Sequence, residues 1–461
     1  MTSREALEAE LVELSWPDAP KMVTEVPGPK VVALMEESAR YESFTRGGGG
    51  FPVILEQGKG VTVKDADGNL YIDMAAGVAV NAVGRGHPKV LAAIQRQCDV
   101  IMHTTDITNP KRIALAKKVS SVMPEGLAGN CHTAVYQAGS DAVETAIKFA
   151  RAYTGRAQLI AFHGAYHGVW CGTAALTTCS NYRHGWGPLI AGVQHLPYAY
   201  CYRCPFGKEY PSCDIQCGTY VGEVLNGPYT GADDVAAVVI ESQQGEGGYV
   251  APPPEFLEMV KAACEKNGCL YIADEVQCGA GRTGKMWAIQ HSSVVPDMLT
   301  WGKGMGGDMP MAGVTYRADM ESALREGSQP STFAGNAMAC EVCMTNIDLI
   351  TDPETDLIGR AAELGAEIRD MFVDAMSTVK CIGDVRGNGL MIGIEVVADQ
   401  KTKEPLGDKT GEIAMKLLNR GILMTPCGRH GNVFRFMPPL TVPRDYAVKA
   451  TEITLDVLKA Y

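Results

Sequence analysis

The sequence predicts an α/β protein with a parallel sheet, and two observations support this fold class. Between about residues 110 and 335, short apolar runs alternate with segments whose apolar residues recur at helical spacing. That alternation is typical of parallel strands whose connecting helices cover both faces of the sheet. Apolar residues make up 46% and charged residues 20% of the 461 residues, an ordinary globular composition. The chain length predicts two or three domains.

Residues 1–75 are expected to form an N-terminal segment that contributes to a small domain. Within it, residues 61–73 contain two short β-rich runs separated by Asp67-Gly68-Asn69. A glycine flanked by Asp and Asn is a turn signal between two strands. This part of the chain therefore predicts a β-hairpin.

Residues 76–340 are expected to form the large domain. Apolar runs at 236–241, 270–273 and 298–301 predict three buried strands of its parallel sheet. Ligands of such sheets bind beyond the carboxyl ends of the strands. The ionisable residues at these three ends are Glu241, Asp274 and Lys303.

Residues 341–461 are expected to form a smaller α+β domain. Two long amphipathic patterns, at 357–376 and 410–420, flank an apolar run at 390–396. A further strand is predicted around 433–436, and a helix closes the chain.

The charge of the chain disfavours some partners. It has 41 Lys and Arg against 53 Asp and Glu, a formal net charge of −12 at pH 7. Without a basic patch, neither a nucleic acid nor a membrane surface is expected to bind. The first residues lack the pattern of a signal peptide, and no apolar stretch reaches the roughly 20 residues that span a bilayer. The protein is therefore expected in the cytoplasm.

Residues 136–144 are predicted to run from a loop into a helix. Ser140 is predicted as the N-cap, because apolar residues follow it at helical spacing. Gly139 and Ser140 would then offer free N–H groups and the positive helix end to a phosphate. An ordinary capped helix is the alternative, and on this segment alone it is favoured.

Asp274 and Lys303 both follow buried strands, where charge is costly. A cation or a hydrogen-bonding group is therefore expected beside Asp274, with a salt bridge to Arg282 as the alternative. Lys303 lies between glycines, so a ligand can approach it closely, and burial would lower the pKa of its amine. These properties suit Schiff-base formation, and a solvated loop lysine is the alternative.

Together these motifs resemble the class III aminotransferases, pyridoxal-phosphate enzymes of fold type I. The resemblance extends from about residue 50 to the C-terminus and rests on seven motifs in the family's order and spacing. They are residues 139–144, 162–168, 240–248, 274–277, 281–285, 303 and 331–336. The resemblance implies a large cofactor-binding domain with a mostly parallel seven-stranded sheet, and a smaller α+β domain.

The resemblance also implies roles around the ring of pyridoxal 5'-phosphate. Lys303 would form the Schiff base and move the proton between substrate and cofactor. Asp274 would pair with the protonated pyridine nitrogen, and Gln277 would hydrogen-bond the ring hydroxyl. Val276 would pack on one face of the ring.

Tyr166 would stack on the opposite face of the ring, with His167 beside it. Three residues are expected to hold the phosphate: Gly139, Ser140 and Thr332. In the family, the threonine at the position of Thr332 reaches the phosphate of the neighbouring subunit. The resemblance therefore implies a homodimer with shared active sites, or a tetramer built from such dimers.

Glu241 and Glu246 match family acids near the substrate entrance. Arg435 matches the arginine that receives the substrate α-carboxylate. When no carboxylate is bound, this arginine would pair with Glu246. An ordinary ion pair at a strand edge is the alternative for Arg435. Family members that act on 4-aminobutyrate usually carry an arginine after the Tyr/Phe-His-Gly triplet, where this chain has Val169. The pocket wall is therefore expected to be more apolar at Val169.

The function implied is an aminotransferase that moves an amino group from an ω-amino acid or amine, such as 4-aminobutyrate, to a 2-oxo acid. The acceptor would be a small molecule such as 2-oxoglutarate or pyruvate. A racemase or amino-group lyase of the same family is the first alternative, because the same lysine and cofactor support those reactions. A non-catalytic cofactor-binding protein is the second.

Four of the 15 cysteines cluster with the spacing C-x2-C-x8-C-x3-C. They are Cys201, Cys204, Cys213 and Cys217. Four thiolates at this spacing can bind zinc tetrahedrally. A structural loop with packed or reversibly oxidised thiols is the favoured interpretation, and no metal site is predicted.

Overall fold

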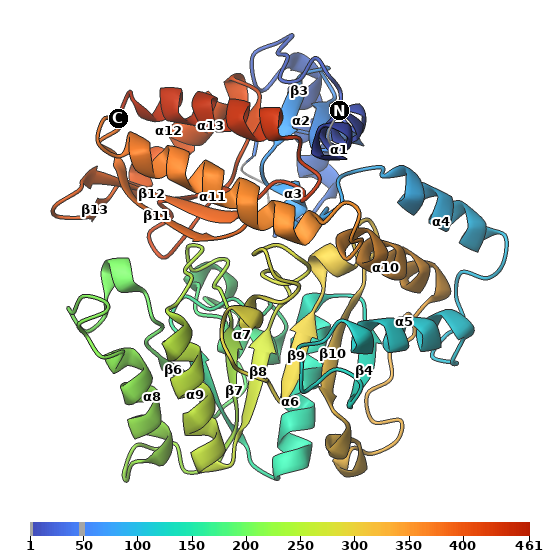
Figure 1. Ribbon diagram of the computed structural model, residues 1–461, viewed down its shortest axis with the longest axis vertical. Coiled ribbons are helices and arrows are strands. Elements are labelled where there is room, and N and C mark those ends of the chain that lie inside the picture. The colour runs from blue at the N-terminus through green and yellow to red at the C-terminus, as the bar shows by residue number, and fades with distance from the viewer. Residues whose placement is uncertain (1–2, 46–50) are drawn as a thin grey trace.

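The large sheet fills the lower half of the computed structural model, which describes residues 3–45 and 51–461 (Figure 1). It has seven strands, in the spatial order β4 (Cys131–Tyr136), β10 (Ala312–Arg317), β9 (Met298–Trp301), β8 (Leu270–Asp274), β7 (Val235–Glu241), β5 (Gln158–Phe162) and β6 (Val193–Leu196). Strand β10 is antiparallel to both neighbours, whereas the pairs from β9 to β6 are parallel. The predicted mostly parallel seven-stranded sheet is confirmed.

The strands of this sheet are buried on both faces, which explains their continuous apolar sequences. In β7, Val238 and Ile240 join the core on one face, and Ala237 and Val239 join the core on the other. Helices α5 (Pro110–Ser121), α8 (Gln216–Asn226) and α9 (Pro254–Asn267) cover the first face. Helices α6 (Gly139–Thr154) and α7 (Cys171–Leu176) cover the second.

The strands predicted at 236–241, 270–273 and 298–301 are β7, β8 and β9, each within one residue at either end. Helix α9 joins β7 to β8 and ends at Gly268. This glycine has a φ of +75° and donates its N–H to the carbonyl of Cys264 at 2.8 Å, a common way to end a helix. The apolar runs and the glycine after the helix therefore predict the strands and the helix end of this stretch correctly.

The N-terminal and C-terminal parts of the chain both lie in the upper half of the molecule (Figure 1). A four-stranded sheet there contains β1 (Leu55–Lys59), β2 (Thr62–Asp65), β3 (Leu70–Asp73) and β14 (Ile422–Leu423). The predicted hairpin is β2–β3, with Gly68 at a φ of +95° in its turn. Strand β3 pairs in parallel with β14, so N- and C-terminal segments share this sheet.

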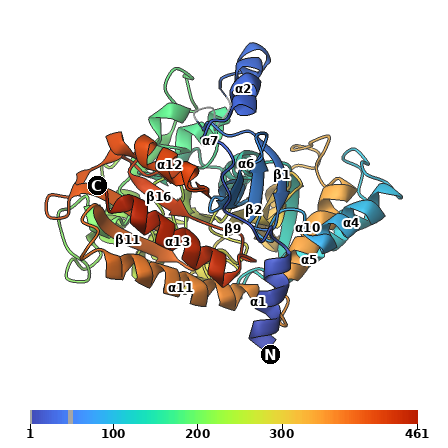
Figure 2. The ribbon, with the colours of Figure 1, turned by 90° about the horizontal axis from the view of Figure 1, so that it is seen from above.

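A second sheet of the upper half comes from the C-terminal part of the chain. Its strands are β11 (Ile382–Asn388), β12 (Met391–Asp399), β13 (Glu404–Pro405), β15 (Pro426–Cys427) and β16 (Val433–Phe436). The three predicted amphipathic helices are α11 (Leu357–Ala375), α12 (Thr410–Asn419) and α13 (Arg444–Leu458). Seen from above, α11 and α13 lie alongside β11 and β16 (Figure 2).

The remaining helices surround these sheets. They are α1 (Ser3–Glu13), α2 (Pro29–Tyr41), α3 (Ala76–Ala79), α4 (Pro88–Cys98) and α10 (Ala337–Ile350). Helix α10 packs against α4 and α5 beside the large sheet. Within residues 3–45 and 51–461, no helix combines the length and apolar character that a membrane crossing requires. The domain boundaries at residues 75/76 and 340/341 stay predictions.

Helix α11 packs so closely on the turn before β12 that one position requires glycine. A Cβ at Gly365 would lie 2.0 Å from the carbonyl oxygen of Gly389. We expect Gly365→Ala to lower the free energy of unfolding by about 1–3 kcal/mol, because backbone atoms must move apart. The urea midpoint of unfolding measures this loss.

Gly411→Ala in α12 is the matched control, since a Cβ there meets no atom within 4 Å. This change should leave the midpoint unchanged or raise it, because alanine favours a helix over glycine by about 1 kcal/mol. Equal midpoints for the two variants would contradict the close contact.

Candidate active site

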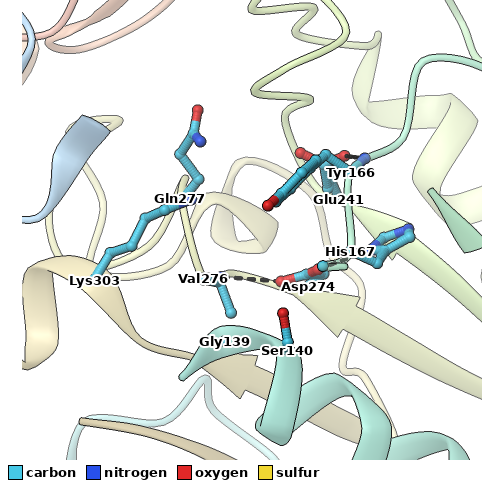
Figure 3. Close-up of a pocket in the computed structure, with 10 residues that line it drawn as sticks. Gly139, Ser140, Tyr166, His167, Glu241, Asp274, Val276, Gln277 and Lys303 are labelled. Atoms are coloured by element: carbon cyan, nitrogen blue, oxygen red, sulfur yellow. Dashed lines mark hydrogen bonds and ion pairs between the residues drawn. The ribbon is translucent and has the colours of Figure 1, made fainter. Parts of the chain in front are cut away.

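A cavity of about 150 Å³ lies where β7, β8 and β9 end and α6 begins. It is lined by Gly139, Ser140, Tyr166, His167, Gly168, Glu241, Asp274, Val276, Gln277 and Lys303. Figure 3 shows Lys303 and Gln277 on one side of this space and Tyr166 and Asp274 on the other. Apart from Gly168, each lining residue is one that the sequence analysis singled out.

Asp274 is the last residue of β8 and is buried. Its Oδ2 lies 2.7 Å from Nδ1 of His167. Its Oδ1 accepts hydrogen bonds from the hydroxyl of Thr300 and the backbone N–H of Val276, each at 3.1 Å. Arg282, the alternative partner, donates instead to two backbone carbonyl groups elsewhere. The expected hydrogen-bonding group beside Asp274 is therefore a histidine.

His167 is buried against Asp274. Burial alone would lower the pKa of His167, but the hydrogen bond and the charge of Asp274 raise this pKa above its ordinary value. The backbone N–H of His167 donates to the hydroxyl oxygen of Thr177 at 2.9 Å, which fixes the chain there. Because an ionised carboxylate can only accept, Nδ1 of His167 is the donor of this bond, and it sets the direction of the carboxylate.

Lys303 begins the short helical turn η4 (Lys303–Met305) directly after β9. Its φ of +43° lies in the left-handed region, which residues with a Cβ rarely adopt. Backbone strain of this kind is concentrated at functional sites. Burial lowers the pKa of the Lys303 amine, and the charges of Asp274 and Glu241 partly offset that effect. Lys303 lines the cavity and is not a solvated loop lysine.

Glu241 ends β7 and holds two loops through backbone hydrogen bonds. Its carboxylate oxygens accept the N–H groups of Tyr166, at 2.9 Å, and Gly245, at 2.8 Å. Burial raises the pKa of Glu241 to about 7, although the charge of His167 acts in the opposite direction. This acid therefore changes its charge near neutral pH.

The start of α6 opens onto the cavity, but Ser140 is not its N-cap. The helix begins at Gly139, and Asp141 accepts the N–H of Ala138 at 3.0 Å. Ser140 is therefore the second residue of the helix, and its hydroxyl faces the cavity (Figure 3). Free N–H groups of a first helical turn attract anions, so a phosphate fits here.

Two glycines allow the segments of the site to approach one another. A Cβ at Gly139 would lie 2.7 Å from Cγ1 of Val276. A Cβ at Gly168, whose φ is +125°, would lie 2.3 Å from Oγ of Ser140. Both contacts are too short for any side chain, so the cavity requires glycine at both positions.

The cavity fits pyridoxal phosphate, the group that the sequence resemblance implies. Two of its buried polar atoms, Oε1 of Gln277 and Nε2 of His167, have no hydrogen-bond partner among the described residues. Buried polar groups are normally paired, so these atoms indicate a polar ligand. Val276 adds an apolar wall, and the start of α6 adds the anion site. Gln277 can lie here because Gly245 has no Cβ, which would stand 2.1 Å from Oε1.

Glu246 and Arg435 form the predicted ion pair. Nη1 of Arg435 lies 2.9 Å from Oε2 of Glu246, and Nη2 donates to the carbonyl of Pro426 at 2.9 Å. The negative charge of Glu246 helps to raise the pKa of Arg435 despite its burial. Both groups act on the pKa of Lys303, so they lie close to the cavity.

Val169 and Thr332 do not line the cavity. Val169 is 44% exposed, and its N–H lies 3.4 Å from the hydroxyl oxygen of Ser140. Thr332 is exposed on the loop before α10, where its carbonyl oxygen lies 2.8 Å from Nε2 of His103. The contact of Thr332 with a neighbouring subunit's phosphate stays a prediction.

Sequence reasoning missed Thr300 and Tyr182. Thr300 is the one hydroxyl in the apolar run of β9, a signal that could have identified it. The ring of Tyr182 packs edge-on against Tyr166, with centroids 5.1 Å apart, and burial raises its pKa to about 12. Nothing in the local sequence around Tyr182 indicates this long-range contact.

The four clustered cysteines lie away from this cavity. They are free thiols and line a separate cavity of about 20 Å³. In the part of the chain that the structure describes, no three or more His, Cys, Asp and Glu side chains are arranged to hold a metal ion.

Comparison with known proteins identifies relatives of the whole chain. The family described as aminotransferase class III matches residues 43–458. The 4-aminobutyrate aminotransferase of Mycobacterium leprae is 35% identical over 445 residues, 95% of this chain and 98% of that protein. The leucine/methionine racemase of Thermococcus litoralis is 35% identical over 396 residues, 86% of this chain and 88% of that protein.

A solved structure shares the architecture. The amine transaminase from an uncultivated Pseudomonas species, in a PLP-bound form, matches with a TM-score of 0.81 and 28% identity. The match covers 88% of this chain and 94% of that one. The predicted fold type I is confirmed.

The raised pKa of Glu241 predicts how stability depends on pH. Glu241 releases its proton near pH 7 in the folded chain and at about pH 4.3 when unfolded. The folded state therefore binds more protons between these values, and the free energy of unfolding falls as pH rises through this window. The contribution lost is on the order of 3 kcal/mol. Urea unfolding at pH 5 and pH 8 measures it.

Glu241→Gln should remove this part of the pH dependence, because the amide does not titrate. Glu404→Gln, the same change at an exposed position, should keep the wild-type dependence. The assignment fails if Glu241→Gln and the wild-type protein lose the same stability between the two pH values.

Proposed function

Because this chain belongs to the class III aminotransferase family, we propose that it transfers an amino group from an ω-amino acid or amine to a 2-oxo acid. The cofactor would be pyridoxal 5'-phosphate. The observation that carries the proposal is that Lys303, Asp274 and the anion-binding start of α6 open onto one cavity. A donor such as 4-aminobutyrate fits the name of the Mycobacterium leprae relative. The acceptor would be a 2-oxo acid such as 2-oxoglutarate or pyruvate.

Lys303 would be the amine that binds the cofactor and moves the proton. Bound pyridoxal phosphate supplies an aldehyde that reacts with amines and a ring that withdraws electrons from the substrate. Burial lowers the pKa of the Lys303 amine. The lowered pKa favours the neutral form of Nζ, which could take up a proton from the substrate carbon and later release a proton within the same site.

Asp274 would hold the proton of the ring nitrogen. His167, Thr300 and the N–H of Val276 fix both oxygens of this carboxylate, so it needs little reorganisation during the reaction. Gln277 would donate to or accept from the ring hydroxyl. Tyr166 and Val276 would enclose the ring from its two faces and exclude water.

The remaining roles concern the phosphate and the substrate. Gly139 and Ser140 would bind the phosphate at the start of α6. Arg435 would exchange Glu246 for the α-carboxylate of a substrate, since the pair already lies beside the cavity. Glu241 would line the substrate side of the site. Val169 would make the entrance more apolar than an arginine would.

A homodimer with shared active sites is part of the proposal, with a tetramer of such dimers as its extension. Thr332 is exposed and lies outside the cavity of its own chain, which supports a role at the phosphate of a neighbouring subunit. A cytoplasmic location is proposed as well.

Racemisation is the second candidate function. The Thermococcus litoralis relative named as a leucine/methionine racemase is 35% identical to this chain. The residues that would bind the cofactor serve both reactions, because the outcome depends on which substrate bond aligns with the ring.

Single amino donors without any acceptor distinguish the two functions. We expect an ω-amino acid or amine to convert the bound cofactor to pyridoxamine phosphate, and the absorption spectrum of the protein follows this conversion. The reaction should stop after the first half-reaction, because no acceptor is present. A 2-oxo acid should then restore the starting spectrum. Product that accumulates without a 2-oxo acid, and without this conversion, would instead support a racemase or lyase.

Lys303→Ala tests the assigned lysine. This variant should lose at least about a thousandfold in kcat, because it lacks both the covalent anchor and the proton carrier. Lys401→Ala, a change at an exposed loop lysine, should retain wild-type turnover. Turnover within tenfold of wild type in Lys303→Ala would exclude the assigned role.

A further inference from the structure

A second cavity of about 400 Å³ adjoins the candidate active site. Its walls include Glu246, Ser180, His163 and Arg429. Glu246 links the two cavities, because it lines the second one and follows Gly245, whose Cα lies against the Gln277 side chain in the first. A substrate held at Arg435 can therefore extend one end into this space.

The hairpin of β15 and β16 places two arginines around Glu246. Arg435 lies in β16 and binds the side chain of Glu246. Arg429 lies in the turn between the strands, where the N–H of Gly428 donates to the carbonyl of Glu246 at 2.9 Å. Arg435 thus bonds the side chain of Glu246, and the residue before Arg429 bonds its backbone.

Arg429 is positioned by the protein but has no acidic partner. Its Nη2 donates to the carbonyl oxygen of His163 at 2.9 Å, and its guanidinium lies 5.7 Å from the ring centre of Tyr200. Among the described residues it makes no ion pair. An uncompensated guanidinium on a cavity wall is suited to a carboxylate or sulfonate.

The other charged group on this wall does not oppose an anion there. The carboxylate of Glu246 is paired with Arg435. Burial and the charge of Arg429 lower the pKa of His163, which favours its neutral form. Arg429 is therefore the one cationic side chain of this wall without a carboxylate partner among the described residues.

We propose that Arg429 binds the carboxylate that a substrate carries at the end away from the reacting carbon; in a dicarboxylic 2-oxo acid this is the end opposite the α-carboxylate that Arg435 would receive. The inference rests on the proposed aminotransferase function and deepens it. This carboxylate could belong to an ω-amino acid donor or to a dicarboxylic 2-oxo acid. The shared chemistry is a short chain that carries an acidic group at its far end.

Binding of glutarate and pentanoate to the cofactor-loaded protein tests this subsite without turnover. The two have the same chain length but differ in the second carboxylate. We expect wild-type protein to bind glutarate at least tenfold more tightly by calorimetry, since a hydrogen bond to a charged group contributes about 1.5–3 kcal/mol. Arg429→Gln should remove that preference, and Arg429→Lys should retain part of it.

Arg369→Gln on α11 is the matched control, because it removes the same charge at a surface ion pair. It should bind both acids as the wild-type protein does. The proposal is overturned if wild type does not prefer glutarate, or if Arg429→Gln keeps the preference. If the protein prefers glutarate through Arg429 but transfers no amino group, the carboxylate subsite is supported and the aminotransferase function is rejected.

Steady-state kinetics of Arg429→Gln identify the source of the carboxylate. If the acceptor supplies it, KM rises about tenfold for 2-oxoglutarate and less than about twofold for pyruvate. If the donor supplies it, KM rises for 4-aminobutyrate and not for butylamine. The assignment is overturned if KM changes equally for 2-oxoglutarate and pyruvate and also equally for 4-aminobutyrate and butylamine.

Discussion

A carboxylate buried at the end of β8 is the constraint on which the candidate site depends. An unpaired charge in such a position costs several kcal/mol, and Asp274 avoids that cost through His167, Thr300 and the N–H of Val276. These partners come from three separate segments of the chain. Satisfying one carboxylate therefore brings together the loop after β5, the strand β9 and the loop after β8. The same burial lowers the pKa of Lys303.

Parallel strands explain why so much of this site could be predicted from the sequence. Strands β7, β8 and β9 are buried on both faces, so each appears as a continuous apolar run with a clear end. Glu241, Asp274 and Lys303 occupy or follow those ends, and the sheet places them at one edge. Contacts between side chains that lie far apart in the sequence could not be predicted in this way. Tyr182, which packs on Tyr166, and Arg429, which lines the second cavity, come from loops whose local sequence carries no such signal.

The incorrect prediction at Ser140 has a local cause. Spacing of apolar residues locates a helix within a residue or two, but it does not show which side chain caps it. Here Asp141 accepts the N–H of Ala138, so the helix starts earlier and the hydroxyl of Ser140 is left for the cavity. Likewise, apolar patterning identified β7, β8 and β9 but not β10, which runs antiparallel to both of its neighbours.

The central claim is that Lys303 is the residue that binds the cofactor covalently. Borohydride reduction of the purified protein, followed by proteolysis and mass spectrometry of the peptides, measures this directly. The account predicts a stable phosphopyridoxyl group on the peptide that contains Lys303 and on no other lysine. A group fixed on a different lysine, or none on Lys303 in protein loaded with pyridoxal phosphate, would contradict it.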